Sequence, residues 1–325
     1  MAERTFHSSS VALVVSCNPT LEVTFCADIK GIGVYTCEEA SWEAGGKSLN
    51  VVRILKILGI PALLVGFAGG HVGEYLKERL HSQAISFKFI AALPETRCSV
   101  VIVNHKGEPI IIRERGRSIE PGTCGDLLKT IESSIAGQNV SCVSVSGSLP
   151  VGAAEGLYVE ICRIANRYAI PVFLDSSGNS LKRALCGSPY IVKSNQQELE
   201  ELLERSLADT NSQITALYEI RSLGAQNVIL TRGERGALAL IENAIYNVRV
   251  PKIKPTNSTG AGDAFHAGLI WACYASGNWE ERLAIATSIA VSSTSFMSSG
   301  WIGHNFREYI SDVTVTKTIH EARCS

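Results

Sequence analysis

The segment Asn257-Ser258-Thr259-Gly260-Ala261-Gly262-Asp263 is a glycine-rich loop that runs directly into the apolar stretch Ala264-Phe265-His266-Ala267-Gly268. This pattern predicts a helix that begins at the loop and ends near Gly277. Free N–H groups at such a helix start, together with the helix dipole, form a site for phosphate. Asp263 lies in the first turn, where the dipole favours the ionised carboxylate, so it can accept a hydroxyl proton. Read alone, the glycines are equally compatible with an ordinary tight turn.

A second glycine loop, Ala44-Gly45-Gly46-Lys47-Ser48-Leu49-Asn50, opens another apolar helix. It is not a P-loop, because Ser41 stands where that pattern requires glycine. It is not a dinucleotide-binding fingerprint either, because the glycines are adjacent. Lys47 is suited to contact a substrate anion and Asn50 a sugar hydroxyl. A helix start with a solvated lysine remains the alternative.

Short apolar segments alternate with helical patterns along the chain. The expected strands cover residues 11–17, 62–67, 142–146, 171–175, 190–193 and 227–231. The expected helices cover residues 49–58, 72–82, 124–136, 155–168 and 196–207. This alternation predicts an α/β fold with a mostly parallel central sheet and helices on both faces.

Two segments, residues 21–42 and 96–117, interrupt the alternation and indicate strand pairs outside the main sheet. In the second segment, two β-rich stretches flank the turn His105-Lys106-Gly107. No linker or internal repeat divides the chain. We therefore expect a single domain of 325 residues. Within it, residues of about 18–43 and 95–118 are expected to form a small β lid over a pocket.

Composition and charge exclude several classes of protein. The chain is 46% hydrophobic, which allows a large core, and its 30 basic and 31 acidic residues give a formal net charge of -1. Such a balance offers no long-range attraction to nucleic acid or to anionic membranes. The apolar run Val11 to Val15 is too short for a signal peptide or a membrane span. We expect a cytoplasmic protein that binds neither nucleic acid nor membrane.

The ten cysteines lack the C-x-x-C pairs of zinc sites. Cys142, Cys162 and Cys273 fall within apolar segments, which indicates small buried thiols in a reducing compartment. Apolar lid strands such as Val100 to Val103 indicate a homodimer whose lids pack together, because an exposed apolar edge invites pairing.

Taken in this order, the two glycine loops resemble the ribokinase-like family, the carbohydrate kinases of the phosphofructokinase B type, over roughly Val11 to Gly300. Further motifs resemble its hexose-phosphate branch, which includes 1-phosphofructokinase, tagatose-6-phosphate kinase and the minor 6-phosphofructokinase. These motifs are Thr96-Arg97, Ser146-Gly147-Ser148-Leu149-Pro150 with Gly152, and Leu174-Asp175 with Ser177-Gly178.

The resemblance implies a role for each matching residue. Asp263 would be the base, and the amides of Gly260, Ala261 and Gly262 would bind the phosphoryl group in transfer. The residues that would hold the sugar phosphate are Glu22, Gly46, Lys47, Asn50, Arg97 and Ser148. Those that would bind ATP are Lys193, Asn195, Glu198, Thr231, Gly233 and Gly236. Asn195 and Glu198 would also reach Mg²⁺ through water, in keeping with the hard oxygen ligands this ion prefers.

Four positions depart from the family pattern. Glu22 stands where an aspartate usually grips substrate hydroxyls, Ser48 replaces a glycine, Ser99 an asparagine and Ser194 a proline. All but the last belong to the expected sugar pocket. The sugar is therefore left open, since discrimination depends on which polar groups meet which hydroxyls.

The favoured function is ATP-dependent phosphorylation of a ketohexose phosphate, namely fructose 1-phosphate, fructose 6-phosphate or tagatose 6-phosphate. One alternative is a kinase for an unphosphorylated sugar or nucleoside, which would not need both Lys47 and Arg97. A second is a catalytically silent sugar-phosphate sensor, which would not need the base. Arg113, Arg115 and Arg117 alternate along an apparent strand end, so they are expected on one face, as a phosphate clamp or a solvated surface.

Overall fold

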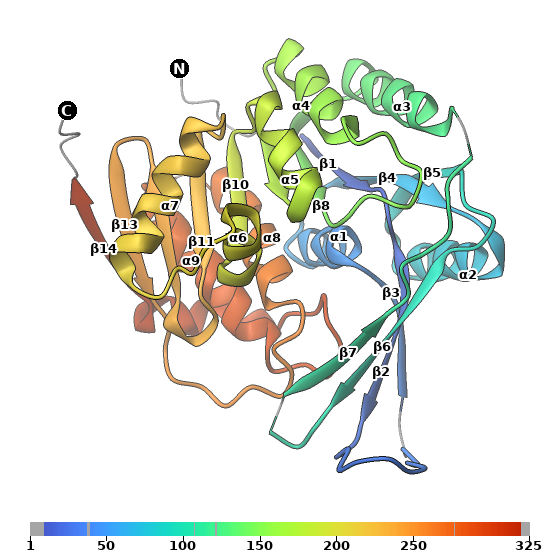
Figure 1. The fold of residues 1–325 in the computed structure, drawn as a ribbon, viewed down its shortest axis with the longest axis horizontal. Helices are drawn as coiled ribbons and strands as arrows, with labels where there is room; N and C mark the ends of the chain where they lie inside the picture. Colours follow the sequence, from blue (N-terminus) through green and yellow to red (C-terminus); the bar gives the residue numbers. More distant parts are fainter. Residues whose placement is uncertain (1–9, 38–39, 107, 121, 276, 320–325) are drawn as a thin grey trace.

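The computed structural model describes residues 10–37, 40–106, 108–120, 122–275 and 277–319. Its main feature is a ten-stranded sheet that runs through the body of the molecule (Figure 1). In spatial order the strands are β14 (Thr314–Ile319), β13 (Ala244–Arg249), β12 (Ala237–Ile241), β11 (Asn227–Thr231), β10 (Ile191–Asn195), β9 (Val172–Asp175), β8 (Val140–Ser146), β1 (Val11–Ser16), β4 (Ala62–Ala68) and β5 (Ser86–Ala91). The strands from β11 to β5 are parallel, and β12 to β14 extend the sheet antiparallel. The expected α/β fold with a mostly parallel sheet is confirmed.

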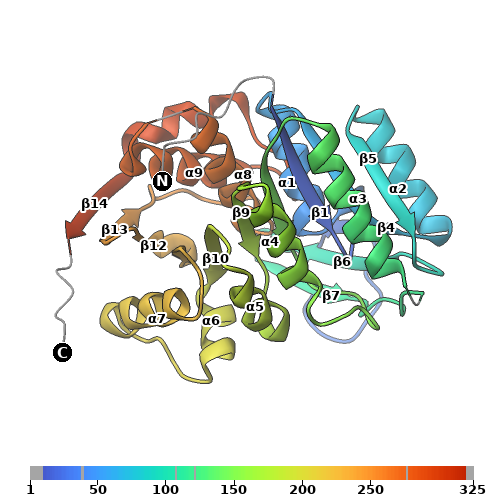
Figure 2. The same cartoon turned by 90° about the horizontal axis from the view of Figure 1, so that it is seen from above.

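Helices cover both faces of this sheet (Figure 2). One face packs against α3 (Thr123–Gly137), α4 (Leu157–Arg167), α5 (Gly178–Ala184), α6 (Gln196–Leu203) and α7 (Thr210–Ser222). The other packs against α1 (Lys47–Ile57), α2 (Gly70–Ser82), α8 (Ala261–Tyr274) and α9 (Trp279–Ser293). Side chains alternate between the faces of a strand, so Val143 joins the first core and its neighbour Cys142 the second. Two cores thus hold the sheet rigid from both sides.

A separate four-stranded sheet projects from the body (lower right in Figure 1). Its order is β3 (Ala40–Gly45), β2 (Thr20–Cys26), β6 (Arg97–Val103) and β7 (Pro109–Arg113). The pairs β2–β3 and β6–β7 are antiparallel, and β2 joins β6 in parallel. The two strand pairs expected outside the main sheet are therefore present as one small sheet, which we call the lid sheet. Residues 38, 39 and 107, which belong to the expected lid and its turn, lie outside the described residues.

Two expected boundaries are wrong. The helix expected to reach Leu207 ends at Leu203, because Glu204 turns into the left-handed region at φ 52°. Leu207 is nevertheless buried, and its N–H donates to Glu200 Oε1 at 2.8 Å, so its apolar character reflects a packed loop. The strand carrying Arg113 also ends there, and the chain turns at Gly116 with φ 93°. Arg115 and Arg117 follow the strand, so the three arginines do not share one strand face.

Cys142, Cys162 and Cys273 are buried free thiols, as their apolar surroundings indicated. Among the described residues, no helix combines the length and apolar character needed to cross a bilayer.

Candidate active site

The carboxyl ends of β9 and β10 meet the first turns of α1 and α8 at one edge of the main sheet. Lys47, at the start of α1, bonds to Asp175 at the end of β9. Lys193, near the end of β10, donates to the carbonyl oxygen of Gly262 in the first turn of α8 at 3.3 Å. In a parallel sheet, such an edge is where ligands bind. Segments far apart in the sequence therefore converge on one site.

Asp175 is the fully buried centre of this site. Its Oδ1 lies 2.7 Å from Lys47 Nζ and its Oδ2 lies 2.5 Å from Lys193 Nζ. Burial alone would raise the pKa of Asp175, but Lys193 and Lys47 outweigh it and hold that pKa well below its usual range. The carboxylate is thus ionised, and it fixes both lysines. The motif Leu174-Asp175 is part of the family resemblance, but the sequence analysis assigned no role to Asp175. The only sequence signal for this role is that a carboxylate ends an apolar strand.

Asp263 lies in the first turn of α8 with only 7% of its surface exposed. Asn50 Nδ2 donates to its Oδ2 at 2.8 Å. Burial, followed by the charge of Asp175, raises the pKa of Asp263 to about 6, while Lys47 and Lys193 act in the opposite direction. A carboxylate with this pKa is ionised at neutral pH and is a stronger proton acceptor than an ordinary aspartate. The geometry therefore places a buried proton acceptor at the start of α8.

The glycine loop before Asp263 is closely packed. Gly260 is the residue before α8 and has φ 82°, and a Cβ there would lie 2.7 Å from Ser299 Cβ. A Cβ at Gly262 would lie 3.1 Å from Lys193 Nζ. The N–H of Ala261 donates to Ser258 O at 3.3 Å, closing the turn. Gly260, Ala261 and Gly262 thus stand at the helix start as expected, beside a lysine.

The residues expected to hold the sugar phosphate fall into separate groups. Lys47 and Asn50 both lie against the buried carboxylates, and Gly46, with φ 100°, is the residue before α1. Glu22 joins this group through Ser299, whose hydroxyl lies 2.5 Å from Glu22 Oε1 and 3.3 Å from Asn50 Oδ1.

A second group is joined through Asn18, which sequence reasoning did not select. Arg97 Nη2 donates to Asn18 O at 3.0 Å, and Asn18 Nδ2 donates to Ser148 Oγ at 3.1 Å. Burial, followed by the charge of Arg113, lowers the pKa of Arg97. Arg113 therefore lies close enough to Arg97 for the two positive charges to repel each other.

The residues expected to bind ATP surround the end of β10. The side chains of Asn195 and Glu198 each accept a hydrogen bond from the other's backbone N–H, a capping box that starts α6. Thr231 is the strand partner of Asn195. Gly233 and Gly236 follow with positive φ angles, and a Cβ at Gly236 would lie 2.0 Å from Val248 O. The structure therefore brings these residues together, and Gly236 also has a structural requirement.

The donors present near α6 suit a hydrated divalent ion. Among the described residues, no three His, Cys, Asp or Glu side chains are grouped as a metal cage. Glu198 has a side chain 14% exposed and offers one carboxylate at the edge of the site. Mg²⁺ commonly binds through one carboxylate while keeping waters and phosphate oxygens. Glu198 and Asn195 therefore fit a water-mediated contact to that ion.

His266 is buried beneath the site, and its Nε2 lies 3.0 Å from Ser144 Oγ. Burial lowers the pKa of His266 to about 4, so the ring is neutral at pH 7. This agrees with the sequence interpretation of His266 as a packed helix residue.

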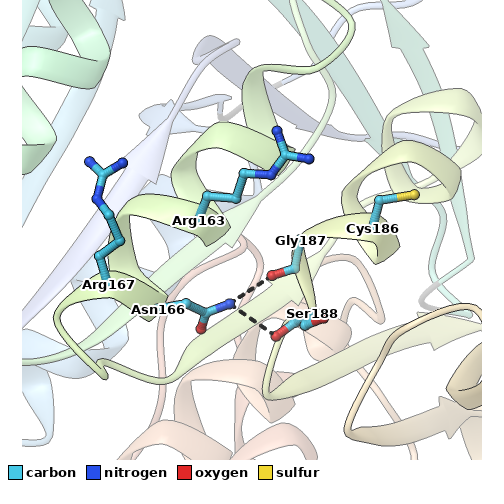
Figure 3. A pocket seen from close by; sticks show the side chains of 6 residues that line it. All are labelled: Arg163, Asn166, Arg167, Cys186, Gly187 and Ser188. Atoms are coloured by element: carbon cyan, nitrogen blue, oxygen red, sulfur yellow. Dashed lines mark hydrogen bonds between the residues drawn. The ribbon is translucent and has the colours of Figure 1, made fainter.

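A cavity of about 540 Å³ lies elsewhere, between the end of α4 and the short 3₁₀ helix Leu185–Gly187 (Figure 3). Arg163 and Arg167 line it, but they are paired with Glu160 and Glu132. The cavity is near the amino-terminal end of β10, whereas Lys193 and Asn195 lie toward its carboxyl end. It is therefore separate from the candidate site.

Comparison with known proteins gives a family match and several similar folds. The model for the pfkB family of carbohydrate kinases matches residues 12–300. The structure of a possible 1-phosphofructokinase from Thermotoga maritima superposes with a TM-score of 0.87 at 23% identity, over 95% of this chain and 99% of that one. Phosphofructokinase-2 from Escherichia coli, in complex with potassium, gives 0.82 at 24% identity, over 93% and 98%. A tetrameric inhibited form of the same enzyme gives 0.81 at 23% identity, over 94% and 99%.

Proposed function

Because the chain belongs to the pfkB family of carbohydrate kinases, we propose that this ATP-dependent kinase phosphorylates a hydroxyl of a ketohexose phosphate, with Asp263 as the base. One observation carries the proposal. Asp263, whose pKa is raised to about 6, lies within the electrostatic influence of Lys47 and Lys193, which are both bonded to Asp175. Phosphoryl transfer requires from the protein a group that accepts the hydroxyl proton and fixed positive charge that stabilises the transferring phosphoryl group.

In the proposed reaction the acceptor hydroxyl oxygen forms a bond to the γ-phosphorus, and the bond from that phosphorus to the oxygen bridging to the β-phosphate breaks. The hydroxyl proton passes to the carboxylate of Asp263, and ADP leaves with the bridging oxygen. Lys193 is fixed beside Gly262, where the loop amides would meet the transferring group. Its charge and the positive end of the α8 dipole would offset the charge that spreads over the phosphoryl oxygens.

Mg²⁺, when bound, neutralises phosphate charge. We assign its water-mediated contacts to Glu198 and Asn195, whose mutual backbone hydrogen bonds hold both side chains at the start of α6. Thr231, Gly233 and Gly236 would line the nucleotide beside them.

A phosphorylated sugar is preferred to a free sugar or nucleoside because cations lie on the sugar side. Lys47 is one, and Arg97 with the neighbouring Arg113 provides another centre of positive charge. Arg97 and Ser148 are joined through Asn18, so they would act together on one group of the substrate. The candidates remain fructose 1-phosphate, fructose 6-phosphate and tagatose 6-phosphate.

We also propose that the protein is a homodimer that pairs through the lid sheet. Ile110 and Ile112 on β7 and Trp42 on β3 are exposed by 50%, 60% and 50%. Large apolar side chains gathered on one small sheet are typical of an interaction surface.

The proposed function is tested by a coupled ADP-release assay over the three ketohexose phosphates, the matching free sugars and a set of nucleosides. We expect turnover with at least one sugar phosphate, and a kcat about 10²- to 10⁴-fold lower for the Asp263→Asn variant with the same substrate. Turnover of free sugars or nucleosides alone would contradict the substrate class. Sugar-phosphate binding without turnover of any compound would instead favour the silent sensor.

A further inference from the structure

Two glutamates face each other in the lid sheet next to the candidate base. Glu22 on β2 is the direct register partner of Glu43 on β3, and each is only 9% exposed. Like charges in directly opposed strand positions repel one another. The pair therefore requires a cation close by, because buried charges must be compensated.

Arg53 of α1 supplies that cation from the interior, with its side chain only 2% exposed. Its Nη2 donates to Ala44 O at 2.6 Å and lies 3.6 Å from Glu43 Oε2. Its Nε donates to Gln83 Oε1 at 3.1 Å. One branch of the guanidinium is thus fixed to strand β3 of the lid sheet.

The other branch of Arg53 reaches the residue that holds Asp263. Arg53 Nη1 lies 3.4 Å from Ser299 O and 3.5 Å from Asn50 Oδ1. Ser299 Oγ lies 2.5 Å from Glu22 Oε1 and 3.3 Å from Asn50 Oδ1. The Ser299 hydroxyl has one proton, which it donates to the Glu22 carboxylate because that group is the stronger acceptor. Asn50 Oδ1 therefore accepts its hydrogen bond from the charged guanidinium of Arg53.

This environment decides which way the Asn50 amide points. With Oδ1 toward the guanidinium, Nδ2 must point to Asp263, where it donates at 2.8 Å. The reversed amide would place an oxygen against the Asp263 carboxylate and an NH₂ group against Arg53, so both contacts would be repulsive. Arg53 and Asp263 thus favour the same orientation of Asn50, the one in which one carboxylate oxygen of Asp263 is held.

The backbone leaves room for this contact. Gly300 has φ 78°, and a Cβ there would lie 2.4 Å from Arg53 Nη1 and 2.7 Å from Asn50 Oδ1. Only glycine accommodates both the left-handed conformation and the close approach of these two side chains.

We propose that Arg53 is a positioning residue for phosphoryl transfer, which orients the Asn50 amide on Asp263 and joins that contact to strands β2 and β3 of the lid sheet. The inference rests on the proposed function of Asp263 as the base. Arg53 is not itself among the residues assigned to sugar or nucleotide, although it contacts one of them, Asn50. Its other contacts are to Ala44, Glu43, Gln83, Ser299 and the ring of Trp301.

Arg79 provides a matched control. Its Nη2 lies 3.3 Å from both carboxylate oxygens of Glu43, so it pairs with the same glutamate as Arg53. Within the described part of the chain, the side-chain hydrogen bonds and ion pairs of Arg79 do not reach Asn50, Ser299 or Asp263. A lysine at position 53 or at position 79 keeps the charge but loses the two-branched donor.

We expect Arg53→Lys to lower kcat by about 10- to 100-fold, the scale of a misplaced catalytic group, with little change in the KM for ATP. The acid limb of the kcat/KM profile should also move to higher pH, because the Asn50 hydrogen bond helps to keep the pKa of Asp263 down. The other charged groups that face Asp263, namely Asp175 on β9, Lys47 on α1 and Lys193 on β10, are unchanged in this variant. Arg79→Lys should leave both kcat and the profile close to wild type.

The inference would be overturned if Arg53→Lys and Arg79→Lys had equal effects, because Arg53 would then act only as an ion-pair partner of Glu43. If Arg53→Lys does not fold, Arg53→Met/Glu43→Gln removes both charges together, and Arg79→Met/Glu43→Gln is its control.

A ¹³C titration of aspartate-labelled protein, with Asp263 assigned through Asp263→Asn, measures the pKa of Asp263 without turnover. An Asp263 pKa unmoved in the Arg53 variant would also refute the inference. Failure of the wild type to phosphorylate any compound would count against the proposed function, while the titration would still decide the role of Arg53.

Discussion

Lys47 Nζ lies 2.8 Å from Glu198 Oε1, although the two residues are 151 positions apart in the chain. Lys47 opens the helix expected to hold the sugar phosphate, and Glu198 opens the helix expected to meet the nucleotide. The same ammonium group also bonds to Asp175. Burial alone would lower the pKa of Lys47, but the charges of Asp175 and Glu198 outweigh it and raise that pKa. One fixed charge is therefore shared by both halves of the site.

The first prediction concerns Asp263→Asn. The variant keeps the size of the side chain but cannot accept the proton, so kcat should fall by about 10²- to 10⁴-fold. ATP binding, measured by calorimetry, should remain close to wild type, because Asp263 is not among the residues assigned to the nucleotide. Activity within a few-fold of wild type would contradict the role of Asp263 as base.

The second prediction concerns pH. The base works only when ionised, and the pKa of Asp263 is raised to about 6, so log(kcat/KM) should fall with unit slope as pH drops below about 6. An aspartate with an ordinary pKa would keep the activity level down to about pH 4. Steady-state assays from pH 5 to pH 8 distinguish the two, provided that circular dichroism shows the fold intact over that range.

The third prediction concerns Lys47→Met. Loss of a charged donor to a phosphate group should raise the KM for the sugar phosphate by about 10- to 100-fold. Because Asp175 also loses one of its two lysines, some fall in the unfolding temperature should accompany it. Glu198→Gln, which releases Lys47 from its other partner, serves as the comparison. An unchanged sugar-phosphate KM in Lys47→Met would favour an unphosphorylated substrate.

The fourth prediction concerns Gly300→Ala. Gly300 and Gly59 both have positive φ, 78° and 80°, so alanine at either position costs about 1–2 kcal/mol of backbone strain. A Cβ at Gly59 meets nothing within 4 Å, whereas one at Gly300 meets Arg53 and Asn50. Gly300→Ala should therefore lose more stability in urea unfolding than Gly59→Ala. It alone should also lower kcat, and equal losses in both variants would count against the packing described.

The fifth prediction concerns oligomeric state. Ile112→Glu places a charge on the exposed apolar face of the lid sheet and should shift the protein from dimer to monomer in light scattering coupled to gel filtration. Leu223→Glu is the control, because Leu223 is also exposed, by 46%, but lies just beyond α7, outside the lid sheet. A wild-type monomer would remove the basis for the proposed dimer.

Much of the fold is readable from the sequence because it depends on local patterns. Apolar runs such as Asn227–Thr231 gave their strands directly, and the glycine loops marked the starts of α1 and α8. The boundaries that differ are those where tertiary packing decides. Leu207 is apolar because it fills a core position from a loop, and periodicity does not separate this case from a helix.

The candidate site was predictable only in its parts. Sequence motifs indicate Lys47 and Lys193 separately, as sugar-phosphate and ATP ligands. Their common bonding to Asp175 depends on how β9 and β10 align in space. Arg53 carries no sequence signal at all, because an arginine within an apolar helix is ordinarily taken as exposed. Its burial follows from Glu43, a residue on another element, and only the three-dimensional arrangement brings the two together.

The lid sheet has a kinetic consequence for folding. Its hairpins are joined by the parallel pairing of β2 with β6, in which Thr20 aligns with Arg97, 77 residues later. No tight turn can close a parallel pair, and the connection between these two strands contains β3, α1, β4, α2 and β5. We therefore expect the pairing of β2 with β6 to form later in folding than the local pairs β2–β3 and β6–β7, so the two halves of the lid sheet would join late.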